Sequence, residues 1–327
     1  MNDLLGICIP TYKRPQQLAA CVQSVITAAQ PHAAPIFIAD DAVDDTNVAT
    51  VEQLRRRYPH IRYHRNATNL GIDRNILNVA NLCDCRYAWL LGEDDRLVPE
   101  AVGEVLRELR REPTFVFVNY STVNEGVTAV LREKALSIAA DEERSAEEFL
   151  ADTGWSIGFI GACVVNKALW HTAPQAPYIG TYFAHVGVIF HYLQGRRLSL
   201  IAKPLVLNRC GTPQTFTWRQ ETFEVLGGWA RLMTCLRPIY GDVVCAQSLE
   251  AFERSHGLGT LRFLLYARAG GVYDEKAYCE HVRDSNRSRA HKLGAWLIAK
   301  SDRRLTHAMY LLLAGIRQRT RRQISGY

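Results

Sequence analysis

The stretch YAWLLGEDDRLVP, from Tyr87 to Pro99, places three adjacent acids, Glu93, Asp94 and Asp95, directly after an apolar run. The run from Tyr87 to Leu91 is short and apolar, as expected of a buried strand. Neighbouring carboxylates repel one another, and an unpaired carboxylate is costly to bury. The triplet therefore predicts either a solvated turn or a site that brings positive charge to the end of a strand.

Strand-like and helix-like segments alternate through the first third of the chain. The predicted strands are Leu4–Ile9, which Pro10 ends, Pro35–Ala39, Ile61–His64, Tyr87–Leu91 and Phe115–Tyr120. The predicted helices between them are Gln16–Ala29, Val48–Tyr58, Asp73–Leu82 and Pro99–Arg111. This alternation predicts an α/β fold with a Rossmann-like, mainly parallel sheet flanked by helices.

Polar or acidic residues follow three of these strands. Thr11 and Tyr12 come after the first strand, and Asp40-Asp41 close the second. Ligands of open α/β sheets bind outside the carboxyl ends of the strands, so we expect these residues and the acidic triplet to share one crevice. No GxGxxG follows the first strand and no GxxxxGK[ST] occurs, which argues against a glycine-rich phosphate loop. A divalent cation held by carboxylates is the alternative way to neutralise a diphosphate.

Composition fits a reduced, intracellular protein with a sizeable core. The chain has 327 residues, of which 48% are hydrophobic, enough for a large α/β domain with an accessory segment. Its nine cysteines form no CxxC pair and no metal-ligand spacing, so we expect reduced thiols. We find no signal sequence and no apolar span of membrane length, and expect a cytoplasmic protein.

Positive charge is concentrated near the C-terminus. Residues 283–327 contain 11 Lys and Arg against two acids, whereas the rest of the chain has a net charge of −3. Within this region, Arg303–Arg322 has an apolar centre and basic ends, and is too short to span a bilayer. It predicts a peripheral helix on the cytoplasmic membrane face. The alternative is a helix docked on the catalytic domain or on a partner subunit. We expect no nucleic-acid partner, because no nucleic-acid motif accompanies the charge.

Four motifs occur in a familiar order. They are ICIPTYKRP (Ile7–Pro15), IADDAVDDT (Ile38–Thr46), NLGIDRNILNVA (Asn69–Ala80) and WLLGEDDRLVP (Trp89–Pro99). Together they resemble family 2 glycosyltransferases of the GT-A fold, and the LLGEDD form resembles the abequosyltransferase-type enzymes of surface polysaccharide assembly. The resemblance implies a GT-A catalytic domain over 1–212, with a nucleotide-sugar half (1–125) and an acceptor half (126–212). A helical C-terminal region would follow over 213–327.

The resemblance also implies a set of site residues. The residues implied to bind the nucleotide are Pro10, Thr11, Tyr12, Arg14, Asp40, Asp41, Asn69, Arg74, Glu93 and Asp94. Among these, Asp41 would hydrogen-bond a pyrimidine and Tyr12 would flank the base, although Tyr12 packed on the sheet rim and Arg74 as an ordinary surface residue are alternatives. Asp94 and Asp95 match the carboxylates that bind Mn²⁺ or Mg²⁺, and Asp95 is also a catalytic candidate.

The sequence departs from the family pattern in three places. The usual DDGS reads Asp40-Asp41-Ala42-Val43, and the first acid of D-x-D falls at Gly92. Relatives carry an acidic pair where this chain has no acid between Thr181 and Arg197, so His185 is our candidate for the general base. A buried histidine, a metal ligand or a diphosphate contact are its alternatives. Trp155 and Tyr182 are weaker candidates for contacting the acceptor, with core packing as the alternative for Trp155.

These observations predict a metal-dependent glycosyltransferase. It would move a hexosyl or deoxyhexosyl group from a nucleoside-diphosphate sugar to a polysaccharide or lipid-linked saccharide acceptor. Two alternatives remain open: a catalytically inactive GT-A scaffold subunit, and a sugar-1-phosphate nucleotidyltransferase, whose glycine-rich N-terminal loop is absent here. The sequence does not identify the sugar, the acceptor, the linkage, the anomeric outcome or the oligomeric state.

Overall fold

The computed structural model describes residues 3–210, 222–257, 260–283 and 288–308. The chain divides into two compact units, the first made of Met1–Thr212 and Gly227–Phe252, the second of Pro213–Leu226 and Glu253–Tyr327. From residue 309 onward, the stretch predicted to be an interfacial helix lies outside the described residues. Within the described part of the chain, no helix combines the length and apolar character needed to cross a membrane.

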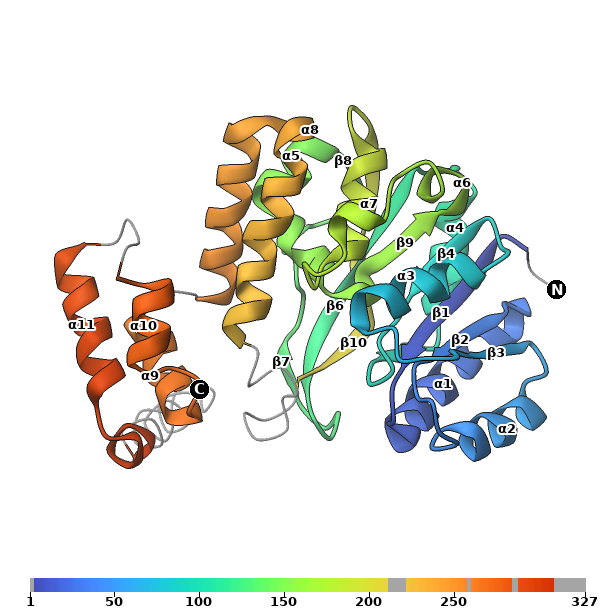
Figure 1. Cartoon of the computed structure of the whole chain (residues 1–327). Helices are drawn as coiled ribbons and strands as arrows, with labels where there is room; N and C mark the ends of the chain where they lie inside the picture. Colours follow the sequence, from blue (N-terminus) through green and yellow to red (C-terminus); the bar gives the residue numbers. More distant parts are fainter. Residues whose placement is uncertain (1–2, 211–221, 258–259, 284–287, 309–327) are drawn as a thin grey trace, which may run out of the picture. The chain divides into compact units, whose positions relative to one another are not determined.

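A ten-stranded sheet forms the centre of the first unit within the described residues (Figure 1). Its strands are β1 (Leu5–Thr11), β2 (Ile36–Asp40), β3 (Ile61–Arg65), β4 (Tyr87–Leu90), β5 (Arg96–Leu97), β6 (Phe115–Asn124), β7 (Val130–Arg132), β8 (Glu142–Ser145), β9 (Cys163–Asn166) and β10 (Arg197–Cys210). The order along the sheet is β3-β2-β1-β4-β9-β6-β10-β5, with β7 beside β6 and β8 beside β10. The predicted α/β fold with a helix-flanked sheet is therefore confirmed.

The two halves of the sheet differ in strand direction. Strands β3, β2, β1 and β4 run parallel, as the alternating pattern predicted. Beyond β4, the short strand β9 is inserted antiparallel to both β4 and β6, and β10 then runs parallel to β6. The sheet as a whole is mixed, and its parallel half is the part that brings the carboxyl ends of β1, β2 and β4 to one edge.

Strand β1 continues through Pro10 to Thr11, so the prediction that Pro10 ends the strand is wrong. Pro10 pairs in register with Ala39 of β2, whereas the pairing of β1 with β4 stops at Cys8 and Leu90. Proline cannot donate a ladder hydrogen bond, and it is tolerated where one side of a strand has no partner. The consequence is that Thr11 and Tyr12 emerge at the end of β1, beyond the last residue of β4.

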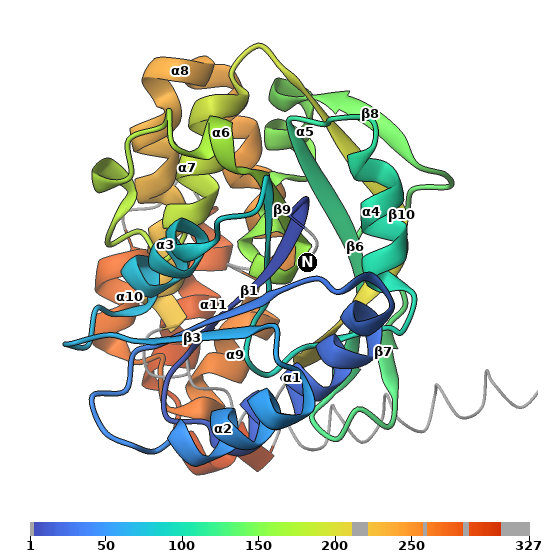
Figure 2. The same cartoon turned by 90° about the vertical axis from the view of Figure 1, so that its right-hand side faces the viewer.

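Helices cover both faces of this sheet (Figure 2). The helices of the first 193 residues are α1 (Pro15–Ala29), α2 (Val48–Arg57), α3 (Ile72–Leu82), α4 (Ala101–Leu109), α5 (Ala146–Asp152), α6 (Lys167–Trp170) and α7 (Ala184–Leu193). Helix α1 packs beside α2 and α4, and α3 packs beside α7. Helix α1 starts at Pro15, a residue preorganised for the first helical turn, and buries Leu18, Val22 and Val25 at helical spacing.

Helix α8 (Thr222–His256) contains a sharp break at Gly241, whose φ of 77° and ψ of 171° are not helical. The left-handed φ suits glycine because it has no Cβ. Within the first unit, the indole of Trp229 stacks on the ring of Phe252 at a centroid distance of 4.8 Å, so the two arms of α8 lie side by side. The Tyr240 hydroxyl donates to the Phe190 carbonyl oxygen at 2.7 Å, which fastens this hairpin to α7.

The second unit contains helices α9 (Leu261–Gly270), α10 (Glu275–His281) and α11 (Arg289–Lys300), in agreement with the predicted helical C-terminal region. Its small core gathers residues from all three helices and the turns beside them: Leu264, Ala267, Tyr273, Ala277, Val282, Ala295 and Ala299. Asp274 caps α10 through the Ala277 backbone N–H, and Ser288 caps α11 through that of His291. This unit therefore has a core of its own.

Two adjacent glycines in α8 give a test of how closely its hairpin packs. A Cβ added at Gly228 would collide with the Thr181 carbonyl oxygen, whereas one added at Gly227 would meet only the flexible Arg231 guanidinium. We expect Gly228→Ala to lower the free energy of unfolding by about 1–3 kcal/mol or more, because backbone atoms must move apart. Gly227→Ala should be neutral or stabilising by up to about 1 kcal/mol, since alanine favours helix. Urea unfolding of both variants is the measurement, and equal effects would contradict the packing.

Candidate active site

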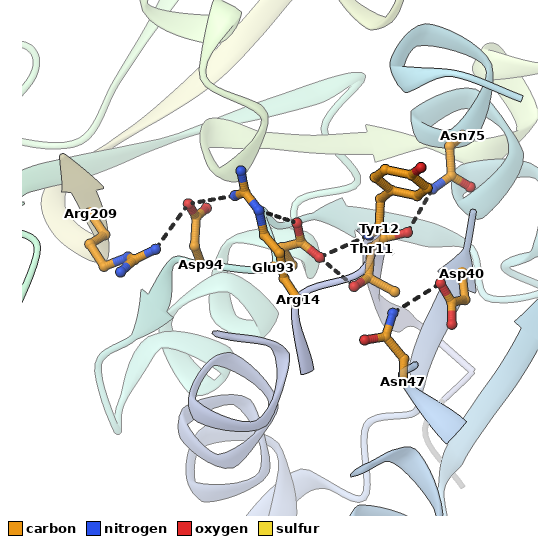
Figure 3. A network of polar contacts seen from close by, with 9 residues as sticks. All are labelled: Thr11, Tyr12, Arg14, Asp40, Asn47, Asn75, Glu93, Asp94 and Arg209. Atoms are coloured by element: carbon orange, nitrogen blue, oxygen red, sulfur yellow. Dashed lines mark hydrogen bonds and ion pairs between the residues drawn. The ribbon is translucent and has the colours of Figure 1, made fainter. Parts of the chain in front are cut away.

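Three neighbouring strands end at the same edge of the sheet, as the sequence predicted. Strands β2, β1 and β4 are adjacent and parallel, so Asp40, Thr11 and the acidic triplet all follow carboxyl ends. Figure 3 shows Glu93 in contact with Thr11 and Arg14, and Asp94 in contact with Arg14 and Arg209, while Asp40 lies beside this group and is bonded to Asn47. The side-chain amide of Asn75, in α3, donates to the Ala39 carbonyl oxygen at 3.1 Å and to the Thr11 carbonyl oxygen at 3.5 Å.

Glu93 connects the end of β4 to the end of β1. Its Oε2 accepts hydrogen bonds from the Thr11 hydroxyl and, at 3.0 Å, from the Tyr12 backbone N–H. Its Oε1 lies 3.5 Å from Nε of Arg14. The side chain is only 12% exposed, and this burial raises the pKa of the carboxyl to about 7 despite the donors around it. Glu93 thus holds the segment that follows β1 against the turn that follows β4.

Asp94 is the most open carboxylate of the triplet, and two arginines flank it. Its Oδ2 lies 3.4 Å from Nη1 of Arg14 and 3.4 Å from Nη2 of Arg209, and the side chain is 31% exposed. The Arg14 guanidinium lies between the carboxylates of Glu93 and Asp94 (Figure 3). The positive charge that the triplet required is therefore supplied by two guanidinium groups.

Sequence reasoning missed Arg209. It lies near the end of β10, and its side chain reaches Asp94 because the short strand β5, which follows the acidic triplet, pairs antiparallel with β10. The backbone N–H of Arg209 also donates to Oδ1 of Asp95 at 3.1 Å. The available signal was an arginine at the end of a strand-like run, but its partner depended on a pairing between residues more than 100 positions apart.

Asp95 is buried, unlike Asp94, and its catalytic and metal-binding roles remain predictions. The side chain is 3% exposed, and burial, with the neighbouring charge of Asp94, raises its pKa well above the ordinary value. A Cβ at Gly92 would collide with Oδ2 of Asp95. A side chain at position 92, the first acid of a D-x-D motif, would therefore require the Asp95 carboxylate to take another position.

The residues present fit a divalent cation only in part. Within the described ranges, no group of three or more His, Cys, Asp or Glu side chains converges on one point. Asp94 is accessible and offers one carboxylate, whereas Asp95 is buried and Glu93 is engaged with the end of β1. One or two carboxylates together with substrate phosphates are a common ligand set for Mg²⁺. Asp94 fits that role, and Asp95 as placed here does not.

Asp40 and Asp41 are both buried within hydrogen-bond networks of the protein. Asp40 accepts from the Ala42 backbone N–H, the Asn47 side-chain amide and the Tyr63 hydroxyl, at 2.8–3.0 Å. Asp41 accepts from the Asn66 side-chain amide and from the backbone N–H groups of Leu70 and Gly71, at 2.7–2.9 Å. Gly71, with a φ of 78°, is held in a conformation that favours glycine. Asp41 thus positions the start of α3, and its predicted contact with a base remains a prediction.

The outer rim of the network is exposed. Tyr12 is 47% exposed, so about half of its surface is open to solvent, and the apolar side chains of Val43 and Ile72 are exposed as well. Arg74 lies exposed in the first turn of α3, and Asn69 accepts from the Gly71 backbone N–H at 3.0 Å. Their roles toward a nucleotide remain predictions, and the exposure leaves Tyr12 and Arg74 accessible to a ligand.

His185 is not at the crevice, and the expectation that its ring faces the diphosphate site is wrong. The residue is 1% exposed within α7, where its Nε2 donates to the Ile157 carbonyl oxygen at 2.9 Å. Burial lowers the pKa of the ring to about 4, so it is neutral at physiological pH. A ring sealed in this way cannot accept a proton from an acceptor hydroxyl.

Asp73 was also missed by sequence reasoning. It is buried in the first turn of α3, and its carboxylate accepts from the backbone N–H groups of Gly180, Tyr182 and Ala184, at 2.8–3.3 Å. These donors include the start of α7, where negative charge is favourable. Asp73 therefore fixes the turn that carries Tyr182, which has a φ of 65°. The proposed acceptor roles of Tyr182 and Trp155 remain predictions.

Residues 6–164 match the model of the family described as Glycosyl transferase family 2. The chain is also 26% identical over 265 residues to the abequosyltransferase RfbV of Salmonella typhimurium, covering 76% of this chain and 79% of that protein. It resembles the abequosyltransferases within the family, as the LLGEDD motif indicated.

Solved structures of S. aureus TarS share the fold of this chain. The structure of TarS 1-349 in complex with UDP-GlcNAc superimposes with a TM-score of 0.59 at 10% identity, covering 94% of this chain and 92% of that one. TarS 1-349 in complex with UDP gives 0.58 at 11% identity, covering 94% and 91%. Against the longer TarS structure, at 10% identity and a TM-score of 0.59, 91% of this chain covers 55% of that chain. The chain thus spans about half the length of that structure.

The burial of His185 predicts a pH dependence of stability. The unfolded chain protonates this ring below about pH 6.5, whereas the folded chain does so only near pH 4. Its contribution to stability is therefore fully present above pH 6.5 and is lost as pH falls toward 4, by up to about 3 kcal/mol. We expect His185→Gln, which can still donate to Ile157, to show a smaller loss of stability between pH 7 and pH 4.

Urea unfolding at several pH values measures this difference between the two proteins. An identical pH dependence in wild type and variant would contradict the assignment. A hundredfold loss of transfer in His185→Gln at unchanged stability and nucleotide affinity would instead place the ring in the reaction.

Proposed function

We propose that this glycosyltransferase moves a sugar from a nucleoside-diphosphate donor, with the diphosphate at the edge where β1, β2 and β4 end. The observation that carries the proposal is the open group of Asp94, Arg14 and Arg209 beside the exposed ring of Tyr12. A base stacked on Tyr12 would place its diphosphate near this charged group. The TarS structures in complex with UDP and UDP-GlcNAc support the donor class.

The charged group suits a departing nucleoside diphosphate. Negative charge grows on the diphosphate as its bond to the sugar breaks, and preorganised positive charge stabilises it. Arg14 and Arg209 already converge on one carboxylate, and guanidinium groups bind phosphate oxygens well. Because Asp94 occupies them here, we infer that donor phosphate competes with Asp94 for one or both arginines. Glu93 keeps Tyr12 and Arg14 in place throughout.

Mn²⁺ or Mg²⁺ remains part of the proposal, with Asp94 as the protein ligand. When bound, such an ion supplies Lewis-acid stabilisation of the diphosphate. Asp94, once released by the arginines, would hold the ion from the protein side. Asp95 is 3% exposed, and it would stabilise the turn through its hydrogen bond from the Arg209 backbone N–H rather than bind the ion.

For the acceptor we propose a polysaccharide or a lipid-linked saccharide, presented at the cytoplasmic membrane face. The likeness to an abequosyltransferase supports a deoxyhexosyl or hexosyl group as the sugar that is moved. Trp155 and Tyr182 are the aromatic groups proposed to contact the acceptor. The Arg132 guanidinium lies 5.5 Å from the centre of the Trp155 ring.

A scaffold subunit without activity is the second candidate. It is favoured by Gly92, which replaces the first acid of the metal motif, and by the burial of Asp95. A protein of this kind would bind a nucleotide sugar without breaking the bond between the sugar and the diphosphate.

The test is a panel of UDP-, GDP-, CDP- and dTDP-sugars with Mn²⁺ or Mg²⁺, scored for nucleoside-diphosphate release. We expect release from one nucleotide class, and a fall of roughly 10²–10³-fold in kcat for Asp94→Asn, the usual scale for losing one electrostatic stabiliser. Glu52→Gln, an exposed acid paired with Arg55 on α2, is the matched control and should keep wild-type activity.

Two results would contradict the transferase site. Wild-type turnover in Asp94→Asn would remove Asp94 from it. Nucleotide binding without any release, across the whole panel and with saccharide acceptors present, would favour the scaffold subunit.

A further inference from the structure

Helix α11, drawn in Figure 1, belongs to the second unit, and its buried and exposed faces differ in chemistry. Ala295 and Ala299 are buried in the small core of that unit. On the other side, Leu293, Trp296 and Leu297 are 57%, 36% and 55% exposed. Residues three and four positions apart are neighbours on a helix, so these three side chains form one apolar patch. Large apolar side chains exposed together usually mark an interaction surface.

Three basic residues lie on the same side of α11 as the patch. Arg289 is four positions before Leu293, Lys292 is four before Trp296, and Lys300 is three after Leu297. Helix α11 contains no Asp or Glu. The ammonium of Lys300 lies 4.8 Å from the centre of the Trp296 ring and 3.6 Å from Glu275 of α10. Arg303 and Arg304 follow, exposed, one turn beyond the helix. The exposed Leu and Trp side chains of α11 can therefore contact an apolar environment, while the Arg and Lys side chains near them can bind negative charge at its boundary.

From this arrangement we propose that the α11 face, defined as Arg289, Lys292, Leu293, Trp296, Leu297 and Lys300, binds the surface of an anionic lipid bilayer. A helix lying in the interface inserts apolar side chains below the headgroups, and its cations stay at headgroup level. Tryptophan suits that depth because its ring is apolar and its N–H is polar.

Lipid fits this surface better than a protein partner does. The α11 face lies on the side of the helix opposite the small core of its unit, and long basic side chains share that side with the patch. Charge complementarity points the same way, since residues 283–327 carry nine net positive charges on a chain that is otherwise slightly acidic. The proposal concerns the second unit alone and holds whichever sugar the transferase moves. It also differs from the tail hypothesis, because α11 ends before Arg303.

The experiment uses the full-length protein and sedimentation with vesicles. One set contains about 30 mol% phosphatidylglycerol in phosphatidylcholine, and the other is pure phosphatidylcholine, each at low and at high salt. We expect binding to the anionic vesicles at low salt, weaker binding at high salt, and little binding to the neutral ones.

Two variants test the two chemistries of the face. Leu293→Ser/Leu297→Ser should weaken binding about tenfold or more, because the inserted apolar area is lost. Arg289→Gln/Lys292→Gln should weaken it roughly 25-fold at low salt, since each cation near an anionic surface contributes about fivefold. Val243→Ser, an exposed aliphatic residue of α8, and Arg56→Gln/Arg57→Gln on α2 are matched controls that should bind like wild type.

Several outcomes would overturn the proposal. A wild-type protein that ignores the anionic vesicles does so directly, and so do α11 variants that sediment like wild type. If size-exclusion chromatography with light scattering shows a wild-type dimer that the Leu293→Ser/Leu297→Ser variant loses, the face joins two copies of this chain instead. Circular dichroism and nucleoside-diphosphate release confirm that each variant is folded, so a loss of binding can be assigned to the face.

Discussion

A buried carboxylate that ties together the ends of two parallel strands determines the rest of this site. Glu93 leaves β4 and accepts hydrogen bonds from Thr11 and Tyr12 at the end of β1, while Arg14 lies against its other oxygen. Hydrogen bonds to a poorly exposed carboxylate are strong, and losing one leaves a buried acceptor without a partner. The direction of Tyr12 and the placement of Arg14 follow from this contact. Asp94, the next residue, is then presented to both arginines.

Asp41 and Asp73 are also buried carboxylates that hold backbone segments through hydrogen bonds. Asp41 holds the backbone at Gly71, and Asp73 holds the backbone before α7, each through two or more N–H donors. The acids of this edge therefore divide into those that position loops and one, Asp94, that remains accessible. This division explains how several negative charges gather at one edge of a sheet: donors of the protein satisfy most of them, and repulsion persists between Asp94 and its neighbours Glu93 and Asp95.

Sequence periodicity could predict the parallel half of the sheet and the meeting of the strand ends. The reason is local: each βαβ unit repeats the same pattern of apolar strand, polar end and helix. Insertion of β9 between β4 and β6 could not be predicted in this way, because it depends on pairing between distant segments. Arg209 was missed for the same reason. The prediction for His185 was wrong because it was based on the ability of imidazole to act as a base. The apolar residues around it, AHVGVIF, predict instead a helix buried on all sides.

Hydrogen exchange of the full-length protein, with and without the nucleoside diphosphate that binds it, tests the location of the donor site most directly. The account predicts slower exchange on binding at 10–14, 69–75 and 92–95, the segments held by Thr11, Asp41 and Glu93, and no change in α11. Unchanged exchange in these three segments, with protection elsewhere in the chain, would show that the ends of β1, β2 and β4 are not where the donor binds.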